Sequence, residues 1–128
     1  MVTGIRGIAW HLRWLCAVAM LLGSAGCGRP PGDALEVEIL ARAPERGNWS
    51  PGTIEVEKGR EVTLIIRNVD VVTHGFYLPA FGLGVSELKA GDVTRLTFTP
   101  EVEGEFPFYC SMWCSDYHMH MRGTLIVR

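Results

Sequence analysis

A twelve-residue segment near the C-terminus, residues 110–121, reads CSMWCSDYHMHM and combines two thiols, two imidazoles and three thioethers. Another histidine, His74, lies upstream in the segment 70–76, DVVTHGF. Soft sulfur ligands together with imidazole suit copper, whereas magnesium, calcium and manganese prefer oxygen. A mononuclear blue copper site uses a single cysteine. Because two cysteine sulfurs can each bridge two metal ions, this segment predicts a site for a pair of copper ions.

The pattern Cys-x3-Cys-x3-His-x2-Met, with a histidine upstream, resembles the binuclear copper A (CuA) centre. That centre occurs in subunit II of cytochrome c oxidase and in the C-terminal domain of nitrous oxide reductase. The segments 73–76 (THGF) and 118–123 (HMHMRG) are most similar to the nitrous oxide reductase version. The likeness covers roughly residues 53–128, and its metal motif is highly specific.

The resemblance implies a role for each donor in the motif. Cys110 and Cys114 would bridge the two coppers, and His74 and His118 would each cap one of them. Two weaker ligands would complete the site, namely the thioether of Met121 and the backbone carbonyl of Met112. No position is left open for a substrate, unlike in catalytic metal sites. We therefore expect no catalytic residues and a site that relays electrons.

Other interpretations of the same residues stay open. Cys110 and Cys114 also fit a disulfide, because exported compartments are oxidising, although a disulfide leaves the histidine and methionine spacing unexplained. Zinc binds cysteine and histidine in four-ligand sites, but methionine does not favour zinc. We expect His120 to be exposed or hydrogen-bonded without binding metal, and Met119 to lie in packing or at the surface.

The N-terminus is typical of an exported protein. Residues 1–13 contain two arginines and no acid, residues 14–22 are apolar, and residues 23–26 are small. This order predicts a secretory signal peptide over residues 1–26. The apolar run is shorter than the about 20 residues that a membrane-spanning helix needs.

Small residues directly before Cys27 resemble a bacterial lipobox, in which the cysteine is lipidated and becomes the first residue of the mature chain. Ser24 departs from that pattern, which usually has leucine there. Lipidation of Cys27 is the expectation, and cleavage near Gly26 with a free thiol, or an uncleaved anchor, are the alternatives.

The cysteine count and the net charge limit which cysteines can bind metal and which kinds of partner the chain can have. Four cysteines in a short exported chain suggest two disulfides, but Cys16 lies in the signal segment and Cys27 at the lipidation position. Only Cys110 and Cys114 remain for the folded domain, where they are free for metal. Residues 28–128 carry ten bases and fourteen acids. This mildly acidic balance argues against a nucleic-acid partner.

Apolar and polar residues alternate in short runs over the rest of the chain, which predicts β-strands. We expect a tether over residues 27–34 and one domain over residues 35–128. The fold class is all-β, an antiparallel Greek-key sandwich, and the resemblance implies the cupredoxin version. The expected strands are Leu35–Leu40, Thr53–Glu57, Glu61–Arg67, Phe76–Leu78, Val85–Leu88, Val93–Phe98, Phe106–Tyr109 and Gly123–Arg128.

These expectations combine into a functional hypothesis. The chain would be an electron carrier with a binuclear CuA centre, exported to the periplasm or the outer cell surface and held at a membrane by a lipid anchor. Its donor would be a c-type cytochrome or a cupredoxin and its acceptor a terminal oxidase or reductase, with Trp113 at the contact. The alternatives are a subunit II-like component of a haem–copper oxidase and a copper delivery or storage protein.

Overall fold

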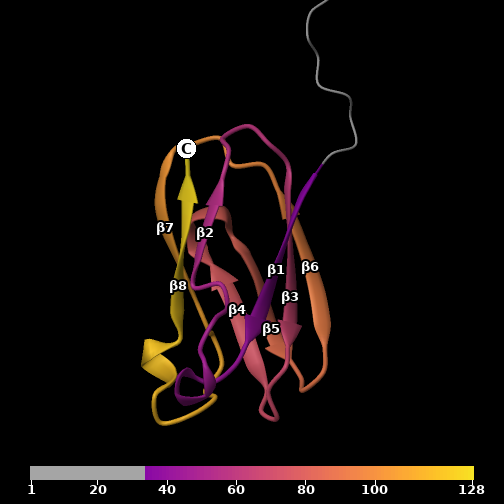
Figure 1. The fold of residues 1–128 in the computed structure, drawn as a ribbon, viewed down its shortest axis with the longest axis vertical. Coiled ribbons are helices and arrows are strands. Elements are labelled where there is room, and N and C mark those ends of the chain that lie inside the picture. Colours follow the sequence, from indigo (N-terminus) through magenta and orange to yellow (C-terminus); the bar gives the residue numbers. More distant parts are fainter. Residues whose placement is uncertain (1–33) are drawn as a thin grey trace, which may run out of the picture.

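The computed structural model describes residues 34–128, which form two β-sheets packed face to face (Figure 1). The first sheet has the strand order β1-β3-β6 and the second β2-β8-β7-β4-β5. The strands are β1 (Leu35–Ala41), β2 (Thr53–Val56), β3 (Val62–Asn68), β4 (His74–Leu78), β5 (Leu83–Leu88), β6 (Val93–Phe98), β7 (Gly104–Tyr109) and β8 (Arg122–Val127). Short 3-10 turns span Pro44–Arg46, Pro79–Phe81 and His118–His120.

The predicted all-β sandwich is confirmed. Residues 34–128 contain no α-helix, and no helix in this part of the chain is long and apolar enough to span a bilayer. The predicted signal peptide over 1–26, the lipidation at Cys27 and the tether up to residue 33 lie outside the described residues.

Alternation of apolar and polar residues builds the core between the sheets. Along β2 the burial alternates, with Ile54 and Val56 inside, while β3 is buried at five of its seven positions. Aliphatic side chains from both sheets fill the interior, chiefly Ile39, Val62, Leu64, Ile66, Leu78, Leu88, Leu125 and Val127. Burial of such side chains is worth about 1.5–3 kcal/mol each, so the core stabilises the domain without a disulfide framework.

The pairing differs from the antiparallel prediction in two places. β1 runs parallel to β3, with Leu35 opposite Val62, and β2 runs parallel to β8, with Thr53 opposite Thr124. The chain passes from β1 in one sheet to β2 in the other and returns to β3 beside β1. Only a short hairpin forces antiparallel pairing, so both directions occur in these mixed sheets.

The connections at one end of the sandwich carry the residues singled out by the sequence. β3 ends at Asn68 and leads through a short turn to His74, the first residue of β4. The segment 110–121 joins β7 to β8, and the connection from β1 to β2 lies next to it at the lower end of the view (Figure 1). Segments that are distant in the sequence therefore meet at one pole.

Candidate metal centre

The structure brings the two cysteines and His74 together in a buried cluster. Their donor atoms, two sulfurs and one imidazole nitrogen, all lie within 4.8 Å of one another. His74 is fully buried and the cysteines are 3 % and 8 % exposed. Both cysteines are free thiols, so each sulfur is available as a separate donor.

The other predicted donors surround the same two sulfurs. The Cys114 sulfur lies 3.6 Å from Nδ1 of His118 and 3.7 Å from the sulfur of Met121. The Cys110 sulfur lies 3.8 Å from Nδ1 of His74 and 3.1 Å from the carbonyl oxygen of Met112. Metal–sulfur and metal–imidazole bonds of about 2.0–2.3 Å are long enough for one ion to bond two atoms at these separations.

The ligand loop, residues 110–121, reaches this arrangement because both of its ends are anchored in adjacent strands. The Cys110 N–H donates to the carbonyl of Met121 across the loop base at 3.1 Å. Successive turn hydrogen bonds then return the chain, with the His118 N–H donating to Ser115 and the Met121 N–H to His118. These backbone bonds hold the two ends of the loop together.

The two thiols differ in their acidity. Burial alone would raise the pKa of Cys110, but hydrogen bonding with His74 and the Gly75 N–H outweighs it and lowers that pKa. Burial and the negative charge of Cys110 raise the pKa of Cys114 to about 12. Cys110 is therefore the more acidic of the two thiols, and a bound metal would displace the proton that a thiol carries.

Asp70 holds His74 from the side opposite the sulfur. Its carboxylate lies 3.1 Å from Nε2 of His74, accepts the Ala43 N–H at 2.7 Å and pairs with Nε of Arg46 at 2.8 Å. Burial would raise the pKa of Asp70, yet these partners lower it far below its ordinary value. With a metal bound, a neutral His74 would carry its proton on Nε2, donate it to Asp70 and present the Nδ1 lone pair to the metal, as metal-binding histidines do beside a carboxylate.

The connection between β1 and β2 is hydrogen-bonded to the C-terminal end of the ligand loop. The Trp49 indole N–H donates to the carbonyl of Met121 at 3.3 Å, and the Asn48 amide donates to that of His120 at 2.9 Å. Trp49 also packs edge-on against Phe76 and Phe108, with ring centroids 5.5 and 5.9 Å apart. An aromatic layer thus closes the site toward the core and excludes water.

Sequence reasoning missed these supporting residues. It assigned no role to Arg46, Asn48, Trp49 or Asp70. A signal existed for Asp70 alone, since it stands in a turn four residues before the candidate ligand His74. His120 is exposed and offers its backbone carbonyl to Asn48, and Met119 is 62 % exposed.

Gly75 allows the ligand loop to pass close to β4. A Cβ at this position would lie 2.3 Å from the Ser111 hydroxyl, 3.0 Å from the Ser86 carbonyl oxygen and 3.3 Å from the Met112 nitrogen. The Gly75 N–H also donates to the Cys110 sulfur at 3.4 Å. A Cβ at Gly75 would therefore require the Ser111 hydroxyl to turn away and the backbone contact between β4 and the loop to widen.

We expect Gly75→Ala to displace the ligand loop and to weaken copper binding by at least about tenfold, with a loss of about 1–3 kcal/mol in stability from overpacking. Copper affinity and urea unfolding measure the two effects. Gly52→Ala is the matched control, because a Cβ there would have its nearest neighbour at 3.6 Å. Equal copper affinities for the two variants would contradict the close approach.

The donor set fits copper. Two thiol sulfurs, two imidazoles, a thioether and a carbonyl exceed the four ligands of a structural zinc site, and the thioether favours a soft ion. The fold and this set of donors define a cupredoxin-type copper domain. The chain belongs to the family of cupredoxin-like domains, whose family profile matches residues 15–127.

The chain is similar in sequence to two groups of curated relatives. The chain is 32 % identical over 99 residues to nitrous-oxide reductase from Ralstonia nicotianae, a match that covers 75 % of this chain and 15 % of the reductase. It is 32 % identical over 80 residues to cytochrome c oxidase subunit 2 from Thermus thermophilus, which covers 62 % of this chain and 58 % of that subunit. The chain thus spans only a part of the length of each relative.

A solved structure shows the same fold. The periplasmic domain of subunit II of cytochrome oxidase from Bradyrhizobium japonicum superposes with a TM-score of 0.64 at 19 % identity, covering 77 % of this chain and 86 % of that one. Fold, family and donor set together support copper binding at this site.

Proposed function

We propose that this chain is an electron-transfer protein whose ligand loop and His74 hold a binuclear, mixed-valence CuA centre. The observation that carries the proposal is the pair of buried, free thiols with four further donors around them. Six residues would hold the metals: Cys110 and Cys114 as bridges, His74 and His118 as caps, and Met121 and the Met112 carbonyl as weak ligands.

A pair of coppers held by these residues would share one unpaired electron when oxidised, so that its bonds would change little on oxidation or reduction. The protein contributes rigidity and dryness to such a centre. Asp70 fixes the orientation of His74. The buried aromatic layer of Trp49, Phe76 and Phe108 forms the side of the site that faces the core and keeps water out there. Donors held in place by their surroundings relax little, which keeps the barrier to electron transfer low.

Trp113 is the proposed contact with redox partners. Its side chain is 68 % exposed, and its ring centroid lies 5.7 Å from that of His118. A partner packed on this indole would therefore come close to a proposed copper ligand. The proposed donors are a c-type cytochrome or another cupredoxin, and the proposed acceptor is a terminal oxidase or reductase, since the relatives carry the names of such enzymes.

Two further assignments accompany this proposal. The protein would act in the periplasm or at the outer cell surface, an assignment supported by the N-terminal sequence and by the periplasmic domain with the same fold. A lipid on Cys27 would hold it there, an assignment supported by the N-terminal sequence alone. Similarity over 58 % of the Thermus subunit favours a second candidate, a subunit II-like component of a haem–copper oxidase.

Electron exchange with a small donor tests the function. The copper-loaded, oxidised protein is mixed with a reduced c-type cytochrome, and the rate of cytochrome oxidation is followed by stopped-flow absorbance. We expect rapid single-electron transfer. Its rate should fall when Trp113 is replaced by alanine, while the copper spectrum stays the same. A protein that binds copper but exchanges no electrons would favour copper delivery or storage.

The variant Met121→Leu tests whether Met121 is a weak ligand or a principal ligand of copper. Met121 is fully buried, with its sulfur 3.7 Å from that of Cys114, and leucine fills nearly the same volume. We expect both coppers to be retained and the reduction potential to move on the order of 59 mV, the effect of about tenfold in a one-electron equilibrium. Voltammetry measures the shift, and complete loss of copper would mean that Met121 is a principal ligand.

A further inference from the structure

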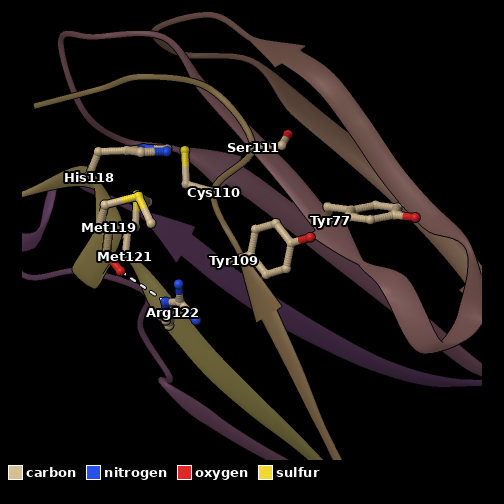
Figure 2. Close-up of a pocket in the computed structure, with 8 residues that line it drawn as sticks. All are labelled: Tyr77, Tyr109, Cys110, Ser111, His118, Met119, Met121 and Arg122. Atoms are coloured by element: carbon tan, nitrogen blue, oxygen red, sulfur yellow. Dashed lines mark hydrogen bonds between the residues drawn. The ribbon is translucent and has the colours of Figure 1, made fainter.

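A cavity of about 290 Å³ opens beside the ligand loop, and its lining is rich in soft donors. Figure 2 shows Cys110, His118, Met119 and Met121 gathered on one side of it, with Tyr77 and Tyr109 on the other. Cys110 and Met121 are buried, whereas Met119 is 62 % exposed. The cavity therefore connects solvent with three of the proposed copper ligands, Cys110, His118 and Met121, and the exposed Met119 lies at its outer edge.

The backbone around Met119 is fixed although its side chain is exposed. Met119 is the middle residue of the 3-10 turn His118–His120, and its carbonyl accepts the Arg122 Nε–H at 2.9 Å. The Asn48 amide holds the next carbonyl in the chain, that of His120. The turn thus presents the thioether at the cavity at little cost in backbone entropy.

Burial gives no reason for a thioether at this position, because a side chain exposed to this degree adds little to the core. A single exposed apolar residue is common on protein surfaces. Met119, however, lines the same cavity as two sulfurs and one imidazole that belong to the proposed metal centre. The Met119 thioether is therefore a soft donor next to the soft donors of the proposed metal centre.

We propose that Met119 is the first ligand for incoming copper(I), which it captures at the mouth of the cavity and passes inward through His118 and Met121 to the two cysteines. The proposal rests on the proposed copper centre. Thioether sulfur selects copper(I) over harder ions. The transfer is a ligand exchange in which copper keeps its charge, and one proton leaves for each thiol that becomes a thiolate.

Charge in the cavity supports this selectivity. Arg122 contributes a guanidinium to the lining, and no carboxylate belongs to the residues that line the cavity. A fixed positive charge opposes hydrated divalent cations, which carry twice the charge of copper(I) and want oxygen ligands. A neutral sulfur at the mouth then favours a monovalent, soft ion.

The rate of copper uptake tests the role of Met119. Metal-free protein is mixed with the copper(I)–bicinchoninate complex, and loss of the colour of that complex is followed by stopped flow. We expect Met119→Leu to slow uptake about tenfold, which corresponds to about 1.4 kcal/mol in the barrier, and to leave the final copper content unchanged. Tyr117→Leu, a change at a 57 % exposed residue of the same loop that does not line the cavity, should leave the rate as it is.

Each other outcome has a definite meaning. Equal uptake rates for the unchanged protein and Met119→Leu would overturn the proposal, and so would an equal slowing by Tyr117→Leu. A lower final copper content in Met119→Leu would make Met119 a permanent ligand and contradict a role in capture alone. Failure of the unchanged protein to take up copper would instead refute the copper centre itself.

Discussion

Replacing either Cys110 or Cys114 with serine should abolish the binuclear centre. Each sulfur lies close to its own imidazole, at 3.8 Å for Cys110 and His74 and at 3.6 Å for Cys114 and His118. A serine hydroxyl is a harder donor than a thiolate and, unlike it, is not ionised near neutral pH, so it cannot bridge two soft ions. We expect at most one copper per chain and loss of the mixed-valence spectrum. Metal analysis and visible absorbance measure both quantities.

Met112→Leu is the control for this prediction, since it changes a residue of the same loop whose proposed contact with copper is the backbone carbonyl alone. That variant should keep the full copper content and spectrum. An unchanged spectrum in Cys110→Ser or in Cys114→Ser would refute the bridging role of the cysteine concerned.

Asp70→Ala should have the largest effect on stability among changes outside the proposed ligands. The 3 % exposed carboxylate accepts hydrogen bonds from the backbone of Ala43 and Val71, pairs with Arg46 and holds His74. Its removal leaves buried donors without an acceptor, so we expect a loss of about 2–4 kcal/mol in the free energy of unfolding. Urea unfolding of the metal-free protein measures it.

The pH dependence of this loss has a definite sign. The pKa of Asp70 is lowered in the folded state, so its contribution is fully present above the ordinary value of 3.8 and disappears as the pH falls toward the folded value. The difference in unfolding free energy between Asp70→Ala and the unchanged protein should therefore shrink below about pH 4.

Glu38→Ala provides the control for Asp70. Glu38 pairs with Nε of Arg67 at 2.9 Å, nearly the distance in the Asp70–Arg46 pair, but its side chain is 52 % exposed. An exposed ion pair is worth at most about 1 kcal/mol. Equal losses for the two variants would mean that burial of the Asp70 network contributes little.

Much of the fold could be predicted from the sequence, because strand formation depends on local alternation. The expected strand Val93–Phe98 is observed with the same bounds, and the other expected strands differ from the observed ones by one or two residues at their ends. Pairing direction was harder to predict. Alternation shows which face of a strand is buried but not which strand lies beside it, so the parallel pairs β1–β3 and β2–β8 came from the structure alone.

The candidate site was predictable where the chemistry lies in residue types and spacing. The structure gathers His74, Cys110, Cys114, His118 and Met121, which the sequence motif had already selected. The residues that support them were not predictable in the same way. Trp49 reaches the ligand loop through the backbone carbonyl of Met121, a residue 72 positions away, and a backbone acceptor leaves no trace in residue types.

Copper content measured together with the electron paramagnetic resonance spectrum tests the central claim most directly. The account predicts about two coppers per chain and one unpaired electron shared equally between both copper nuclei, because two thiolates bridge the pair. One copper per chain with a spectrum from a single nucleus would contradict it.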